Sequence, residues 1–116
     1  MDQNLIARLL EGNAGKPFSR AAIKKLFDDI EQSFFHEIES GKISPVQFSG
    51  FINNEIFEFA ETLEDDERDL FMELIMIEAA SRENSKEDGS LVNYMDPDSD
   101  QWNFYIRFKI SRPLGV

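Results

Sequence analysis

Hydrophobic residues recur at three- and four-residue spacing through most of the chain, which is the pattern of helices that bury one face. The spacing predicts a short helix over Asn4–Leu10, ended by Gly12, and a long helix that Ser19 caps and that ends near Ser40, with Gly41 as its stop. The apolar stripe of the long helix consists of Ile23, Leu26, Phe27, Ile30, Phe34 and Ile38.

The stretch SPVQ predicts the start of a third helix. Ser44 is a good N-cap, Pro45 suits the first helical position, and Gln47 completes a capping box. The predicted inward stripe of this helix consists of Phe48, Phe51, Ile52, Ile56, Phe59 and Leu63.

A fourth helix is predicted to begin near Asp65 or Asp66 and to run to about Arg82. Its apolar residues cover most of the circumference, with only Glu73 and Glu78 between them in the middle of the helix. They are Leu70, Phe71, Met72, Leu74, Ile75, Met76 and Ile77. A helix that is apolar nearly all round is typical of a buried central position.

After a polar loop, the hydrophobic period changes from that of a helix to two, which indicates strands. The strands are LVNYM and QWNFYIRFKISR, joined by DPDSD. Trp102, Phe104, Ile106, Phe108 and Ile110 share one face of the second strand. Because an isolated hairpin is marginally stable, this face must lie on the helices. We therefore expect one α+β domain over residues 1–116, with about four helices followed by a C-terminal antiparallel β-hairpin.

The net charge of −11 at pH 7 changes the picture most, because small soluble domains usually carry a magnitude of about 2–8. Phosphate repels such a chain, so direct binding to nucleic acid or an anionic membrane is disfavoured and a basic partner is favoured. The chain has no cysteine, which suits a reducing cytoplasm. It also shows no apolar run of signal-peptide or membrane-span length. The expected location is the cytoplasm.

Acidic residues are concentrated between Ser44 and Ser81, where Arg68 is the only basic residue. Carboxylates in the first turn of the fourth helix stabilise its dipole, but Glu61 and Glu64 lie near the C-terminal end of the third helix, which disfavours anions. Residues that break a local rule often have a function. We therefore predict partner binding by Glu58, Glu61, Glu64, Asp65, Asp66 and Asp69. The alternative is a solvated face that only keeps the protein dispersed.

Two residues of the third helix do not fit its pattern. Phe57 projects about 180° from Phe48 and is predicted to be an apolar contact for the partner, or else to pack on a neighbouring loop. Glu55 falls within the apolar arc, so either the helix bends there or this carboxylate lies at the edge of the core with a partner that the sequence does not identify.

Catalytic and metal-binding patterns are weak. The DPDSD stretch opens like a calcium loop, but Gln101 and Arg107 stand where that loop requires Gly and Glu. Its carboxylates, Asp96, Asp98 and Asp100, are instead assigned to partner binding as a second negative cluster. His36 is the only histidine, and one imidazole cannot build a common zinc site. We expect no enzymatic activity, no cofactor and no metal.

The stretches ETLEDDERDLFMELI, ENSKEDGS and MDPDSD resemble in composition the small acidic bacterial proteins called DNA mimics, and also the immunity proteins that neutralise nuclease toxins. The resemblance to DNA mimics implies that carboxylates held on rigid helices take the places of phosphates. Carboxylates three or four residues apart on a helix are separated by ~4.5–6 Å along its axis, and phosphates on one DNA strand by about 3.4 Å of rise.

Three functions follow as hypotheses. The first is a non-enzymatic protein that blocks the nucleic-acid site of a basic partner, such as a histone-like protein, a repressor or a nuclease. The second is an immunity protein with one cognate nuclease toxin. The third is a structural or adaptor subunit that pairs through the strand edge between Trp102 and Ile110. The expected oligomeric state is a monomer or a weak homodimer.

Overall fold

The computed structural model describes residues 4–13, 15–85, 88–95 and 104–109. Its helices are followed by an antiparallel hairpin, which confirms the predicted α+β class. The elements are α1 (Leu5–Leu9), the 3-10 turn η1 (Glu11–Asn13), α2 (Arg20–Glu39), α3 (Pro45–Glu61), α4 (Asp65–Glu83), β1 (Leu91–Met95) and β2 (Phe104–Phe108).

The helix ends form as the local sequence predicts. Ser19 Oγ accepts a hydrogen bond from the Ala22 amide at the start of α2. At the start of α3, Ser44 and Gln47 form the reciprocal capping box, which satisfies two amides that the helix itself leaves unpaired. Gly41 follows α2 with a φ of 85°, a conformation that a residue with a Cβ rarely adopts.

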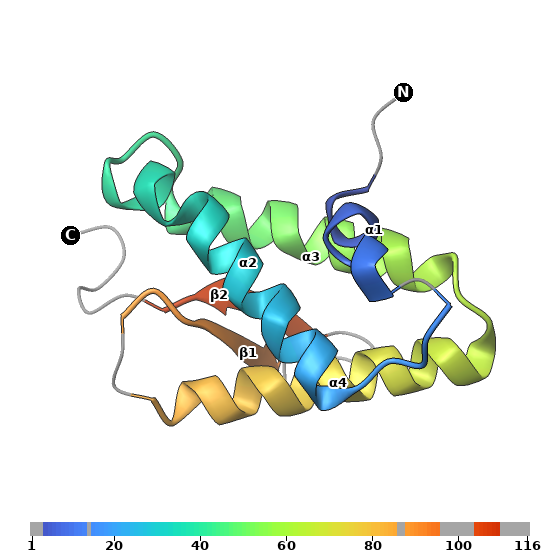
Figure 1. The fold of residues 1–116 in the computed structure, drawn as a ribbon. Helices are drawn as coiled ribbons and strands as arrows, with labels where there is room; N and C mark the ends of the chain where they lie inside the picture. Colours follow the sequence, from blue (N-terminus) through green and yellow to red (C-terminus); the bar gives the residue numbers. More distant parts are fainter. Residues whose placement is uncertain (1–3, 14, 86–87, 96–103, 110–116) are drawn as a thin grey trace.

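The elements form two layers (Figure 1). In one layer, α3 lies beside β2 and α4 lies beside β1, with the hairpin between the two helices. In the other layer, α2 crosses over the hairpin, and α1 packs on α3. The connection between α3 and α4 therefore forms a corner at one end of the molecule, at the right of Figure 1.

The outer edge of β2 is bonded to side chains of α3. Asn53 is buried; its Oδ1 accepts from the Ile106 amide at 2.7 Å, and its Nδ2 donates to the Ile106 carbonyl at 2.9 Å. One turn earlier, Ser49 Oγ accepts from the Phe108 amide. The two bonding sites are spaced alike on the helix and on the strand, because four residues of helix rise about 6 Å and two residues of strand about 6.7 Å. At Ile106 and Phe108 these backbone groups are thus already bonded within the chain, and the adaptor hypothesis of pairing through the edge between Trp102 and Ile110 stays a prediction.

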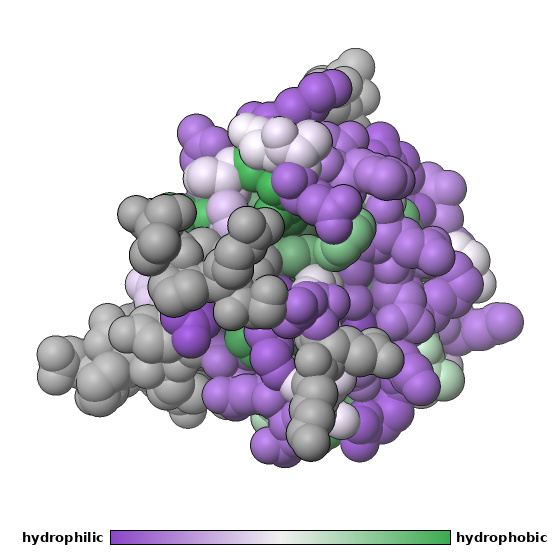
Figure 2. Space-filling model, turned by 90° about the vertical axis from the view of Figure 1, so that its left-hand side faces the viewer, coloured by the Kyte–Doolittle hydropathy of each residue, from purple (hydrophilic) through white to green (hydrophobic). Residues whose placement is uncertain are grey.

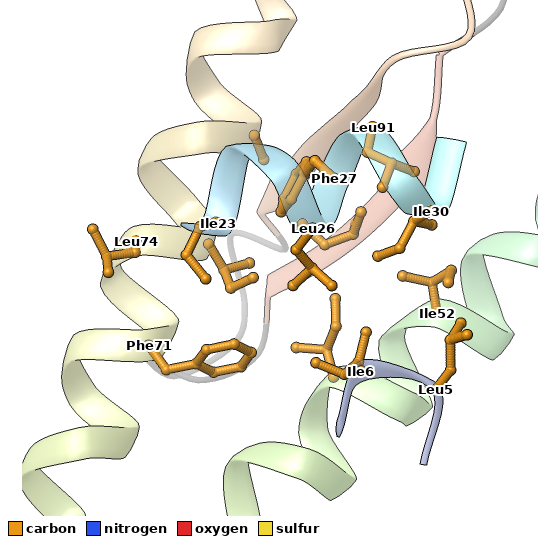
Figure 3. Packing of buried hydrophobic residues seen from close by; sticks show 14 of the residues in the cluster. Leu5, Ile6, Ile23, Leu26, Phe27, Ile30, Ile52, Phe71, Leu74 and Leu91 are labelled. Carbon is orange, nitrogen blue, oxygen red and sulfur yellow. The ribbon is translucent and has the colours of Figure 1, made fainter. Parts of the chain in front are cut away.

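Side chains from every layer meet in one core (Figure 3). Ile6 of α1, Phe27 of α2, Ile52 of α3 and Phe71 of α4 are fully buried. Ile106 and Phe108 of β2 are buried too, whereas Tyr105 and Arg107 are exposed, as the alternation along the strand predicts.

The predicted stripe of α3 is wrong at Phe51, which is 44% exposed. The buried arc is rotated toward Asn53, which is not part of the predicted stripe, because the hydrogen bonds to β2 draw that side of the helix inward. Phe51 is left at the edge of the helix, in contact with Phe34.

The prediction that α4 is buried on all sides is also wrong. Phe71, Met72, Leu74 and Ile75 are buried, but Leu70 and Ile77 are 38% and 39% exposed. Because α4 lies at the rim of its layer rather than between layers, it has a solvent-facing side, and apolar residues stand on it.

Arg82 joins α2, α4 and β1 through a group of ion pairs. Its guanidinium contacts Asp28 and Glu78 at 2.7 Å and Glu31 at 2.9 Å, and Glu31 in turn accepts a hydrogen bond from the Leu91 amide. Burial raises the pKa of Glu31 above its ordinary value, although the Leu91 amide and Arg82 favour the charged form. Burial opposes the charge of Arg82, but its hydrogen bonds to the carboxylates outweigh that effect and raise its pKa.

Candidate functional site

The predicted partner-binding carboxylates of α3 and α4 surround one corner of the molecule. Glu58 and Glu61 lie in the last turn of α3, Glu64 lies between the helices, and Asp65, Asp66 and Asp69 lie at the start of α4. All six are exposed. We call this group the acidic corner; it is formed where α3 meets α4 (Figure 1).

Cations are scarce at the acidic corner. Of its six carboxylates, only Asp65 has an ion pair within the described part of the chain, with Arg68 at 2.7 Å. Such an exposed pair contributes little to stability. Residues 44–81 hold ten acidic side chains and one basic one, a net charge of −9 out of −11 for the chain. Most of the net negative charge is therefore carried by the segment that contains α3 and α4.

Two other carboxylates of the same helices have structural partners. Glu55 Oε1 accepts a hydrogen bond from the Leu5 amide at 2.7 Å, and the Glu55 carbonyl accepts one from Asn4 Nδ2. This identifies the partner of Glu55 that the sequence could not, namely the N-terminus of α1. Glu78 is 5% exposed and pairs with Arg82. We therefore leave Glu55 and Glu78 out of the candidate site.

Phe57 lies beside the acidic corner but is not an exposed anchor. It is half-buried, and its side chain packs against the core. It lines a cavity of about 360 Å³ between α3 and α4, together with Ala60, Glu61, Arg68 and Met72. The corner thus combines exposed carboxylates with a hollow that apolar side chains line together with Glu61 and Arg68.

Sequence reasoning missed the exposed apolar residues of α4. Leu70 and Ile77 lie seven residues apart, on the solvent-facing side that also carries Asp66 and Glu73. Their spacing places them on one side of the helix. The signal that could have found them is Glu73 itself, because a carboxylate in the middle of an apolar helix marks its solvent side.

Asp96, Asp98 and Asp100 lie outside the described residues. His36 is exposed. Among the residues that the structure describes, no group of three or more His, Cys, Asp or Glu side chains is arranged to hold a metal ion. Within the same ranges, every helix is too short or too polar to span a membrane.

Comparison of the chain with family models, with curated proteins and with solved structures finds no match. Functional inference therefore depends on the acidic corner and on the surfaces around it.

Proposed function

We propose that this protein is a non-enzymatic acidic binding protein that acts as a DNA mimic. In this proposal the acidic corner occupies the nucleic-acid site of a basic DNA-binding protein in the cytoplasm and blocks it. The observation that carries the proposal is the exposure of six carboxylates at one helix–helix corner, only one of them in an ion pair within the described residues.

The physical basis is electrostatic. A DNA-binding protein presents Lys and Arg along a groove, and a folded anion that enters the groove releases counterions as DNA does. The acidic corner is held by two helix ends that the core fixes in place, so little ordering entropy is lost on binding. Its concentrated charge also accelerates the encounter with a basic surface.

The cavity beside Phe57 favours a second candidate, an immunity protein that neutralises one nuclease toxin. A largely apolar hollow beside the exposed carboxylates would favour a partner with an apolar side chain among basic ones, which gives more specificity than charge alone. The two candidates differ in their partners, because a mimic competes with DNA at the site of a DNA-binding protein, whereas an immunity protein retains one exclusive nuclease.

The test removes charge from the acidic corner without removing volume. A variant with Glu58→Gln, Glu61→Gln and Glu64→Gln leaves the Asp65–Arg68 pair intact, so no cation is left unpaired. Affinity capture at 50 mM and 300 mM salt, with identification by mass spectrometry, is expected to recover a basic DNA-binding protein on the wild type at low salt only. DNA should compete, and the triple variant should bind at least about tenfold more weakly.

The matched control removes the same net charge from exposed positions outside the acidic corner, through Glu11→Gln, Glu83→Gln and Asp88→Asn. Its affinity for the captured partner should stay within about twofold of wild type, because salt screens the interaction of an exposed charge with groups more than a Debye length away. Equal loss in the two variants would mean that only total charge matters. Neutral or acidic partners, or binding that salt does not weaken, would overturn the proposed function.

A further inference from the structure

The molecule has an apolar end opposite the acidic corner. A cavity of about 350 Å³ lies between the end of α2 and the start of α3, lined by Phe34, Ile43, Gln47, Phe48 and Phe51. Phe51 is 44% exposed. Figure 2 views the molecule from this end and shows hydrophobic residues open to solvent among hydrophilic ones.

The aromatic lining of this cavity is held in place. Phe48 is fully buried, and its ring lies 5.1 Å from that of Phe34, whose ring lies 5.9 Å from that of Phe51. Because Phe48 also contacts Phe108 of the hairpin, the rings are fixed to the core. Rigid aromatic rings around a hollow are favourable for association, because little side-chain entropy is lost when they are covered.

The charges around this cavity are of both signs, unlike those of the acidic corner. Glu39, the last residue of α2, and Lys42, between α2 and α3, are both exposed. Glu37 lies next to Ile43, whose amide donates to the Glu37 carbonyl. Glu37 Oε2 is buried, and the described residues provide no hydrogen-bond donor to it. Because that oxygen is enclosed, Lys42 and Glu39 are the charged groups at this end that a second molecule can contact.

We propose that two copies of this chain associate through this end, which we call the α2–α3 end: the cavity-lining residues with Lys42, Glu37 and Glu39. A two-fold interface must be self-complementary. In this arrangement a two-fold rotation brings the Lys42 of one copy toward the exposed Glu39 of the other, and each Phe51 toward the other cavity. The mixed charge makes a second copy the fitting occupant.

The charge distribution also selects this end. Two copies that met at their acidic corners would bring like charges together. The acidic corner lies at the far end of α3, about 21 Å along the helix from Gln47, so this dimer keeps the two corners on its outer ends. If the proposed function holds, the dimer presents two negative surfaces to a two-fold symmetric DNA-binding partner, and its avidity exceeds that of a monomer.

The experiment is sedimentation equilibrium of the full chain alone at concentrations from 5 µM to 500 µM, with no partner present. We expect a reversible monomer–dimer equilibrium for the wild type. Raising salt from 50 mM to 500 mM should strengthen the dimer, because screening weakens the repulsion between two copies of charge −11. Salt has the opposite effect on capture of a basic partner, so the two proposals can fail separately.

Two variants locate the interface. Phe51→Gln should weaken the dimer about tenfold or more, since it removes an apolar contact twice in a symmetric interface. Gln47→Glu retains the capping box, because Glu serves at that position as well as Gln, but it places two like charges across the interface. It should weaken the dimer at low salt without lowering thermal stability, because a carboxylate in the first turn of α3 is favourable to the helix dipole.

Each variant has a matched control. Leu70→Gln removes an apolar side chain of similar exposure from α4, and Gln32→Glu adds the same charge on the exposed side of α2. Both controls should dimerise like the wild type. A wild type that is monomeric at 500 µM, or a control that weakens the dimer as much as its paired variant, would overturn the inference.

Discussion

Substitution of Glu61 tests whether the carboxylates of the acidic corner lower the stability of the fold. It is the last residue of α3 and is exposed; a negative charge there opposes the helix dipole by about 0.3–1 kcal/mol. Glu58 lies three residues earlier on the same helix, and a like-charge neighbour at that spacing adds about 0.2–0.5 kcal/mol. Glu61→Gln should therefore raise the free energy of unfolding by about 0.5–1.5 kcal/mol at low salt.

The measurement is urea unfolding followed by circular dichroism at 20 mM and 500 mM salt. The gain should shrink at high salt, because the repulsion is between solvent-exposed groups. The same variant should weaken capture of the basic partner. A variant that is more stable but binds the partner more weakly is the result expected if Glu61 is retained for binding.

Glu67→Gln is the opposing control. Glu67 lies in the first turn of α4, where a carboxylate stabilises the dipole, so its neutralisation should lower the free energy of unfolding by about 0.3–1 kcal/mol. If Glu61→Gln is neutral or destabilising while Glu67→Gln behaves as expected, then Glu61 is locally compensated. The inference that the acidic corner is kept for a partner would then lose its energetic support.

Two further predictions concern the residues that join the layers. Asn53→Ala leaves the Ile106 amide and carbonyl without their partners, so the free energy of unfolding should fall by about 2–4 kcal/mol; a loss below about 1 kcal/mol in urea unfolding would show that water replaces the side chain. Burial raises the folded-state pKa of Glu31 above the ordinary 4.5. The contribution of protonated Glu31 to the free energy of unfolding is therefore complete below pH 4.5, and it is lost as the pH rises through the folded-state pKa. The stability of wild type relative to Glu31→Gln should therefore decline from pH 4.5 upward, and an NMR titration of Glu31 at or below 4.5 would contradict this.

Local signals in the sequence were sufficient for the ends of the helices. Ser19, Ser44, Gln47 and Gly41 act within a few residues of themselves, so the chain near each residue determines what it does. The alternation in β2 also predicted its buried face, because the period of two is a property of the strand alone.

Contacts between distant segments were not predictable from the pattern. The buried arc of α3 is rotated by Asn53, whose partner lies 53 residues away in β2. The Glu55 carboxylate finds its donor 50 residues earlier, at Leu5. For the acidic corner, the sequence located the charges, but their exposure depends on where α4 sits in the layer, which the helical period does not encode.

The bonds from α3 to β2 also specify how the hairpin is aligned. If the strands slipped by two residues, every side chain would keep its face, so burial alone would barely oppose the error. Such a shift, with β1 fixed, would move Ile106 away from the amide of Asn53, and Phe108 away from Ser49. Helix α3 thus fixes the register of the hairpin. Misaligned forms, whose unpaired strand edges favour aggregation, are therefore disfavoured as the protein folds.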